Sequence, residues 1–109
     1  MKIKMFEGTE ESVYRDCVKE GYRPATMKQI HNLIMEKEIP NQWYNVSEVR
    51  SPNFVIRKIT KSECLNLKKF IKGGGRVSYL SSLNCDYTFI AGNRNVGNDS
   101  GRLVGVKSK

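Results

Sequence analysis

The stretch GNRNVGNDSGR contains the glycine spacing of a phosphate-binding loop. Gly92 and Gly97 are separated as in the motif G-x-x-x-x-G-K-[ST], in which backbone amides surround the phosphates, the lysine neutralises them and the hydroxyl holds magnesium. Asn98 and Asp99 stand where that motif has its lysine and its serine or threonine, and Asp99 would place a negative charge against the phosphates. The residues that follow are β-like rather than helical. The stretch therefore lacks the groups that nucleotide hydrolysis requires.

The histidine and the cysteines do not form a catalytic or metal-binding motif. His31 is the single histidine, and no nucleophile or carboxylate is placed by the sequence to make it a general base. Cys17, Cys64 and Cys85 are widely spaced, so neither a complete disulfide framework nor a C-x-x-C zinc motif is present. We interpret the cysteines as small buried hydrophobic residues. The sequence thus predicts no enzyme activity, no cofactor and no metal.

The positive charge of the chain is concentrated in its second half. The net charge is +8; residues 1–54 contain eight basic and eight acidic side chains, whereas residues 55–109 contain eleven basic and three acidic ones. Lys61, Lys68 and Lys72 would share one face of a helix. A solvated helix face is one interpretation, because exposed lysines normally cover such surfaces. The other is a basic patch that neutralises phosphates, formed by Arg57, Lys58, Lys61, Lys68, Lys69, Lys72 and Arg76.

The last third of the chain mixes aromatic, amide and guanidinium side chains. This combination is typical of adaptable binding surfaces, where rigid rings supply contact area and amides supply hydrogen bonds. Turn formation is the alternative explanation for the asparagines, since they tolerate left-handed backbone conformations. It explains less well why so many polar and glycine positions separate two apolar strands. We predict that the partner-binding residues are Tyr79, Asn84, Tyr87, Asn93, Arg94, Asn95, Asn98, Asp99 and Arg102.

Three capping signals mark the expected helix starts. Thr9, Thr26 and Thr60 each precede residues suited to a first helical turn, and Thr26 and Thr60 begin capping boxes with Gln29 and Glu63. Apolar residues then recur at helical spacing after each threonine. The expected ends of the three helices are Gly21, Ile39–Pro40 and Gly73–Gly75.

Strands are expected mainly in the second half. The segments that predict strands are Lys2–Phe6, Phe54–Ile59, Arg76–Leu80, Tyr87–Ala91 and Arg102–Val106. Because helices come early and most strands late, we expect an α+β fold in which two to three helices pack on a mainly antiparallel, twisted sheet. The length of 109 residues predicts a single compact domain over residues 1–109.

The chain has no apolar run near the ~18 residues that a membrane helix requires. Residues 1–7 also lack the apolar core and cleavage site of a signal peptide. We therefore expect a cytoplasmic protein without a membrane partner.

Two segments resemble parts of the C-type lectin-like domains of the formylglycine-generating-enzyme type. GYRPAT at residues 21–26, leading into a helix, is similar to the family's helix entry GYRLPT, and GRLVGVK at residues 101–107 is similar to its closing strand GFRVVR. Trp43 and residues 77–82 stand at fitting intermediate places in a likeness scattered over residues 21–107. The family's RGGSW segment is absent, as is the context of its catalytic cysteine, which Cys85 alone does not replace.

This resemblance implies helices packed against twisted antiparallel strands, with ligand contacts near the penultimate strand and the loop beside it. In variable proteins of diversity-generating retroelements, the corresponding region is diversified at adenines, often in asparagine codons. Here that region lies between Asn84 and Arg102. The resemblance therefore implies a binding module and argues against oxidase activity.

Together these features predict a non-enzymatic binding module that recognises a macromolecular partner, in the first place a protein, through its C-terminal strand–loop surface. The alternative is a small basic accessory protein of phage type that binds nucleic acid or inhibits a host nucleic-acid-targeting defence complex. Salt dependence separates the two, because phosphate binding weakens steeply as the salt concentration rises.

Overall fold

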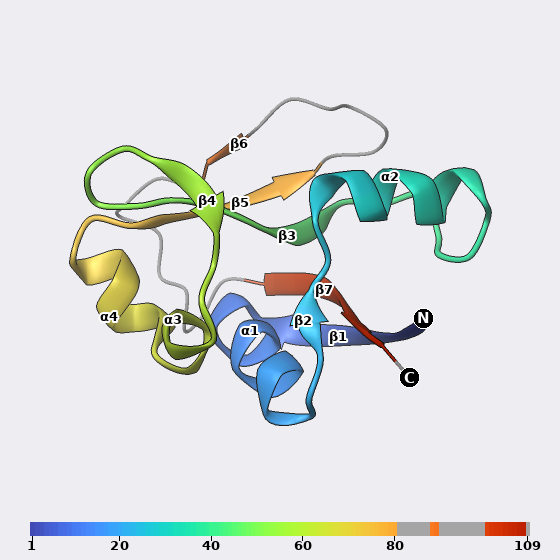
Figure 1. Cartoon of the computed structure of the whole chain (residues 1–109), viewed down its shortest axis with the longest axis horizontal. Helices are drawn as coiled ribbons and strands as arrows, with labels where there is room; N and C mark the ends of the chain where they lie inside the picture. The colour runs from blue at the N-terminus through green and yellow to red at the C-terminus, as the bar shows by residue number, and fades with distance from the viewer. Residues whose placement is uncertain (81–87, 90–99, 109) are drawn as a thin grey trace.

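A computed structural model describes residues 1–80, 88–89 and 100–108, with residues 88–89 described by their backbone alone. Its elements (Figure 1) are β1 (Lys2–Thr9), α1 (Glu10–Lys19), β2 (Arg23–Pro24), α2 (Met27–Met35), β3 (Tyr44–Arg50), β4 (Ile56–Lys58), α3 (Lys61–Leu65), α4 (Leu67–Lys72), β5 (Arg76–Leu80), β6 (Thr88–Phe89) and β7 (Ser100–Lys107). Helices and a mostly antiparallel sheet confirm the expected α+β class. Over the described residues, no helix is long and apolar enough to cross a membrane.

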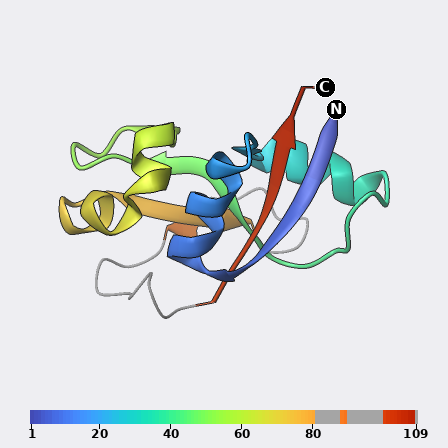
Figure 2. The same ribbon diagram turned by 90° about the horizontal axis from the view of Figure 1, so that it is seen from below.

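The described strands form one mixed sheet in which β7 is an interior strand. The strand order is β1-β7-β3-β5-β6, with β2 also pairing with β7 and β4 with β3. Every pairing is antiparallel except that of β3 with β7, which has the single parallel pair Asn45 and Leu103. Figure 2 shows β1 and β7 side by side, with the N- and C-terminal ends together.

Two glycines of β7 allow other parts of the chain to approach this strand closely. A Cβ atom on Gly101 would lie 2.7 Å from the Cα of Glu10, at the start of α1. A Cβ atom on Gly105 would lie 2.8 Å from the Cβ of Tyr22, just before β2. Both distances are well below the ~3.5–4.0 Å at which carbon atoms attract one another. The packing of α1 and β2 on β7 therefore requires glycine at both positions.

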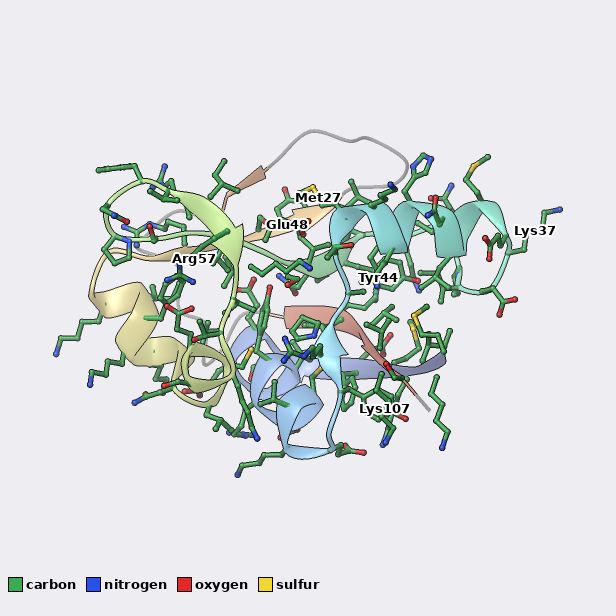
Figure 3. The ribbon with its side chains drawn as sticks, viewed as in Figure 1. Met27, Lys37, Tyr44, Glu48, Arg57 and Lys107 are labelled. Atoms are coloured by element: carbon green, nitrogen blue, oxygen red, sulfur yellow. The ribbon has the colours of Figure 1, made fainter. Side chains whose placement is uncertain are left out.

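All three expected helix starts are present and carry capping boxes. The hydroxyls of Thr9, Thr26 and Thr60 each accept a hydrogen bond from the backbone NH of the residue three positions later. The side chain of that later residue accepts a hydrogen bond from the backbone NH of the threonine. These bonds satisfy backbone donors that a helix start otherwise leaves free. At α2 the Glu48 carboxylate also accepts a hydrogen bond from the Met27 NH, at 3.0 Å (Figure 3).

The expected third helix is divided into the two short helices α3 and α4. Asn66 stands between them with φ −141° and ψ 56°, outside the helical region. Asparagine lowers helix stability because its side chain competes for backbone hydrogen bonds. The expected common face of Lys61, Lys68 and Lys72 is therefore wrong, because Lys61 belongs to α3 and the other two to α4.

The strand expected over Phe54–Ile59 begins later, at Ile56. Phe54 has φ 66°, in the left-handed region, and its NH donates to the Ser51 carbonyl oxygen at 2.9 Å in the turn between β3 and β4. The turn conformation thus prevails over the strand preference of an aromatic residue, which depends strongly on context.

The remaining differences concern the ends of elements and two strands that were not expected. Helix α2 ends at Met35, before the expected Ile39–Pro40, and β1 continues to Thr9. Strands β2 and β3 have no counterpart among the expected strands. Strand β2 has two residues, one of them a proline, and carries no periodic signal. For β3, the sequence predicts only extended chain after a turn at residues 41–44. Of the expected strand Tyr87–Ala91, β6 is the part that lies within the described residues.

The buried apolar residues form two clusters, one on each face of the sheet. Consecutive strand residues point to opposite faces, and Leu103 and Val104 of β7 accordingly belong to different clusters. The first cluster contains apolar residues of α1, α3 and α4, whereas the second contains those of α2. Helices therefore cover both faces of the sheet.

A buried polar connection joins α1 to strands β3 and β7. Asn45 Nδ2 donates to Glu10 Oε2 at 3.1 Å, and Asn45 Oδ1 accepts from the backbone NH of Arg102 at 3.1 Å. The Glu10 and Asn45 side chains are fully buried. The Tyr14 hydroxyl adds a bond from α1 to the Val46 carbonyl oxygen at 2.7 Å. These bonds supplement the single backbone pair between β3 and β7 and satisfy polar groups that would be costly to bury alone.

Replacing Asn45 with alanine should destabilise the fold by about 2 to 4 kcal/mol, because the Arg102 NH loses its acceptor and the Glu10 carboxylate loses a donor in the interior. Urea unfolding followed by circular dichroism measures the change. The control is Asn32→Ala on the exposed side of α2, which should alter the free energy of unfolding by less than about 0.5 kcal/mol. A loss below about 1 kcal/mol for Asn45→Ala would show that the connection is unimportant.

Candidate functional site

Two of the predicted partner-binding residues, Tyr79 and Arg102, meet at Trp43. The Trp43 and Tyr79 rings are edge to face, with centroids 6.2 Å apart and an interplanar angle of 72°. The guanidinium carbon of Arg102 lies 4.9 Å from the Trp43 ring centroid, within the range of cation–π attraction. All three side chains are half-buried. We call these three residues the aromatic–arginine cluster.

The Arg102 side chain is held in place from several directions. Its Nη1 donates to the Trp43 carbonyl oxygen at 3.3 Å, and its Nε lies 3.4 Å from Oε1 of Glu7 on β1. Its backbone NH is fixed by the buried Asn45. A side chain already ordered in the free protein loses less conformational freedom when a partner binds. The aromatic–arginine cluster is therefore preorganised.

The cluster lies at both ends of the segment that connects β5 to β7. Tyr79 is next to the last residue of β5, and Arg102 is close to the first residue of β7. Asn84, Tyr87, Asn93, Arg94, Asn95, Asn98 and Asp99, the other predicted partner-binding residues, lie outside the described residues, as do Cys85 and the Gly92–Gly97 spacing. The described contact residues thus flank the segment in which the remaining ones occur.

Trp43 is the member of the cluster that the sequence did not indicate as a contact residue. Its residue type was a usable signal, because tryptophan is enriched among residues that dominate interface energies and this chain has one. Its partners are distant in sequence, however. The pairing of β3 with β5 and β7 brings Trp43, just before β3, to Tyr79 and Arg102.

The two arginines of the predicted basic patch are engaged within the molecule. Arg57 forms a two-pronged pair with Glu63, with nitrogen–oxygen distances of 2.8 and 2.7 Å. Hydrogen bonding to Arg57 holds the pKa of the Glu63 carboxyl below its ordinary value. Arg76 Nη1 donates to the carbonyl oxygens of Ile71 at 3.3 Å and Gly75 at 2.6 Å. These contacts stabilise the region of α3 and α4.

The lysines of the patch are exposed and belong to β4, α3 and α4. Lys68 lies 3.7 Å from Glu11 of α1 in an exposed ion pair. Lys58, Lys61, Lys69 and Lys72 are exposed, and none of them forms an ion pair with another described residue. Lys58 and Lys61 border a cleft to which Lys69 and Lys72 do not contribute. The predicted patch therefore comprises two separate pairs of unpaired cations.

The two described thiols are buried and lack activation. Cys17 and Cys64 are free cysteines with at most 1% exposure. Burial raises the pKa of each thiol from 9.0 to about 12, so the nucleophilic thiolate is scarce near neutral pH. His31 Nδ1 is buried without a hydrogen-bond partner. The part of the chain that the structure describes contains no group of three or more metal-ligating side chains.

The turn between β3 and β4 exposes three consecutive apolar side chains. Phe54, Val55 and Ile56 are 75%, 51% and 48% exposed. The guanidinium carbon of Arg50 lies 5.0 Å from the Phe54 ring centroid. The run of apolar residues after Ser51–Asn53 predicts a strand. The one feature of the sequence that indicated exposed side chains is that this run directly follows the turn residues. This tip is a second surface on which apolar contacts could form.

Replacing Arg102 with alanine should uncover the Trp43 ring and weaken the fold by about 1 to 2 kcal/mol, through loss of the cation–π contact and the bond to the Trp43 carbonyl. Acrylamide quenching of tryptophan fluorescence should increase, and urea unfolding gives the energy. The matched control is Arg15→Ala, which removes an exposed pair with Asp16. Equal quenching in both variants would contradict the described packing.

Stability should decrease as the pH rises from about 9 to about 12. The raised pKa values of Cys17 and Cys64 mean that the unfolded thiols release protons in this range while the folded ones retain them, which favours the unfolded chain. Below pH 9 the contribution is fully present. Urea midpoints in reducing buffer at pH 8, 9.5 and 11 measure the decrease. The variant Cys17→Ala/Cys64→Ala should show a shallower decrease, and an identical slope in both proteins would refute the prediction.

No protein-family model, no curated protein and no solved structure matches the chain. The aromatic–arginine cluster and the surfaces around it are therefore interpreted from their own chemistry.

Proposed function

We propose that this protein is a non-enzymatic binding module that recognises a protein partner through the aromatic–arginine cluster and the segment between β5 and β7. The supporting observation is that Trp43 contacts both Tyr79 and Arg102 at a half-buried site. Tryptophan, tyrosine and arginine are the residue types that most often dominate the energy of protein interfaces. Together they combine a large apolar area with a charged group that is already oriented.

The charge of the chain favours a partner with an acidic surface. The net charge is +8, and opposite charges accelerate the encounter of two proteins. Exposed lysines such as Lys69 and Lys72 would act in this way without contacting the partner. Arg102, by contrast, would contribute to the contact itself.

The resemblance to lectin-like domains leads to the same surface. It places ligand contacts near the penultimate strand and its loop, which corresponds here to Asn84–Arg102. The observed α+β architecture is compatible with this relation, as it is with other families. Both the family relation and a diversified segment stay predictions.

Nucleic acid is the second candidate partner, and the geometry of the basic residues favours it less. Binding to a phosphate backbone requires several cations that are free to replace counterions. Arg57 and Arg76 are engaged internally, and the break at Asn66 separates Lys61 from Lys68. The excess of positive charge is therefore better suited to attracting an acidic protein than to binding along a phosphate backbone.

The proposal is tested by partner capture with the immobilised protein, followed by affinity measurement with the purified partner. The variants are Tyr79→Ala, and Tyr87→Ala/Arg94→Ala/Asn95→Ala combined, with folding verified by circular dichroism. Each should weaken binding at least tenfold, as expected when interface anchors worth more than ~1.4 kcal/mol are truncated. The control Lys69→Gln/Lys72→Gln lies on α4 and should reduce the association rate more than it raises the dissociation rate.

The salt response discriminates between the candidates. Binding to a protein through the cluster should persist in half-molar salt, whereas binding that collapses under these conditions and is destroyed by nuclease treatment would establish nucleic acid as the partner. Unchanged affinity in both site variants would exclude this surface.

A further inference from the structure

A cleft of about 300 Å³ lies between β2 on one side and β4 with α3 on the other. Tyr22 and Arg23 line it from the β2 side, and Lys58 and Lys61 from the β4 and α3 side. Ser47 of the central strand β3 also belongs to the lining. None of the three residues of the aromatic–arginine cluster lines this cleft, so it is a separate feature of the molecule.

The charged residues that line the cleft are all basic. Arg23, Lys58 and Lys61 come from three different elements, and none of them forms an ion pair with another described residue. Like charges that share one concave surface repel one another and create a positive potential there. The fold therefore holds three unpaired cations around one small space, where an anion would relieve their repulsion.

The acidic residues adjacent to the lining in sequence are engaged elsewhere. Glu20, just before the Gly21 of the lining, pairs with Lys4. Glu48, which follows Ser47 and stands opposite Lys58, accepts the hydrogen bond of the α2 start. Glu63, two residues after Lys61, pairs with Arg57. These three carboxylates therefore do not form ion pairs with Arg23, Lys58 or Lys61, which are exposed.

The uncharged lining residues indicate the size and kind of ligand. Ser47 brings a hydroxyl to the lining. The Thr26 and Gln29 side-chain oxygens accept the hydrogen bonds of the α2 capping box, which leaves the Thr26 O–H and the Gln29 amide N–H as donors to phosphate oxygens. The Tyr22 ring is packed edge to face against Phe6 at 6.0 Å, and the Lys107 ammonium lies 4.4 Å from its centroid. A volume of about 300 Å³ is at the lower end for ligand pockets.

We propose that this cleft binds the phosphate group of a small phosphorylated molecule, with Arg23, Lys58 and Lys61 as the residues that neutralise it. Arginine can donate two parallel hydrogen bonds to a phosphate, and the two lysines act as point charges on the β4 and α3 side of the cleft. The apolar side chains of Val18, Ile59 and Val106 in the lining would contact the remainder of the molecule.

The test is a titration of the ¹⁵N-labelled protein with inorganic phosphate and with glycerol phosphate at constant ionic strength, using chloride as the balancing anion. Saturable shifts are expected for the backbone amides of residues 22, 23, 25, 26, 47 and 58–61. The variant Lys58→Gln/Lys61→Gln should raise the dissociation constant at least tenfold, and Arg23→Gln should act in the same direction. The matched control Lys69→Gln/Lys72→Gln removes the same charge from α4 and should change it by less than twofold.

Three outcomes would overturn the proposal. The first is the absence of saturable shifts with either probe, and the second is an equal loss of affinity in the α4 control, which would mean that net charge alone attracts phosphate. The third is binding of a phosphoserine peptide ten times tighter than that of glycerol phosphate, which would assign the cleft to a protein partner. Partner capture is measured with variants of other residues, none of which lines the cleft. A negative phosphate titration would therefore leave the proposal of a protein partner unaffected.

Discussion

The buried side chain of Asn45 connects the parts of the molecule on which the candidate site depends. Its amide group links Glu10 at the start of α1 to the backbone of Arg102 in β7, where β3 and β7 share a single backbone pair. The Arg102 side chain then reaches Trp43, two residues before Asn45, and Tyr79 is the partner of Asn45 on β5. One buried amide therefore links β3, which Trp43 directly precedes and which pairs with the β5 strand of Tyr79, to the β7 strand of Arg102. A polar group at this depth contributes specificity of arrangement as well as stability, because few alternative packings would satisfy it.

Local chemistry made much of the fold predictable, and non-local contacts account for the rest. Each threonine that begins a helix forms its cap with residues up to three positions away, so Thr9, Thr26 and Thr60 could be recognised from the sequence. The break at Asn66 and the left-handed turn residue Phe54 contradict strong local patterns, and strand β2 is held by its pairing with β7 rather than by any preference of its own. For the site, residue type indicated Tyr79 and Arg102. The place of Trp43 between them depends on strand order, which no local pattern encodes.

The distribution of charge shows a similar difference between composition and surface. The second half of the chain carries the basic excess, yet its arginines at positions 57 and 76 are engaged with a carboxylate and with helix-end carbonyls. The unpaired cations of the patch are two on α4 and two on β4 and α3, and the latter two line a cleft together with Arg23 from the evenly charged first half. The fold thus converts a diffuse excess of charge into one concave positive site and one exposed positive helix. These can serve different purposes, since the first can enclose an anion and the second can only attract one.

The interior position of β7 has a consequence for the order in which the molecule assembles. β7 is the last of the described strands along the chain, yet it lies between β1 on one side and β2 and β3 on the other. During synthesis on the ribosome, β1 has no partner among the described strands until β7 emerges. The pairing of β1 in the sheet is therefore delayed until β7 has been synthesised. Closing a chain of this length before its strands can pair is entropically costly and places such topologies among the slower folders. In the meantime the unpaired edge of β1 is open to other chains, and the lysines at positions 2 and 4 and the glutamate at position 7 give that edge charges of the kind that discourage such pairing.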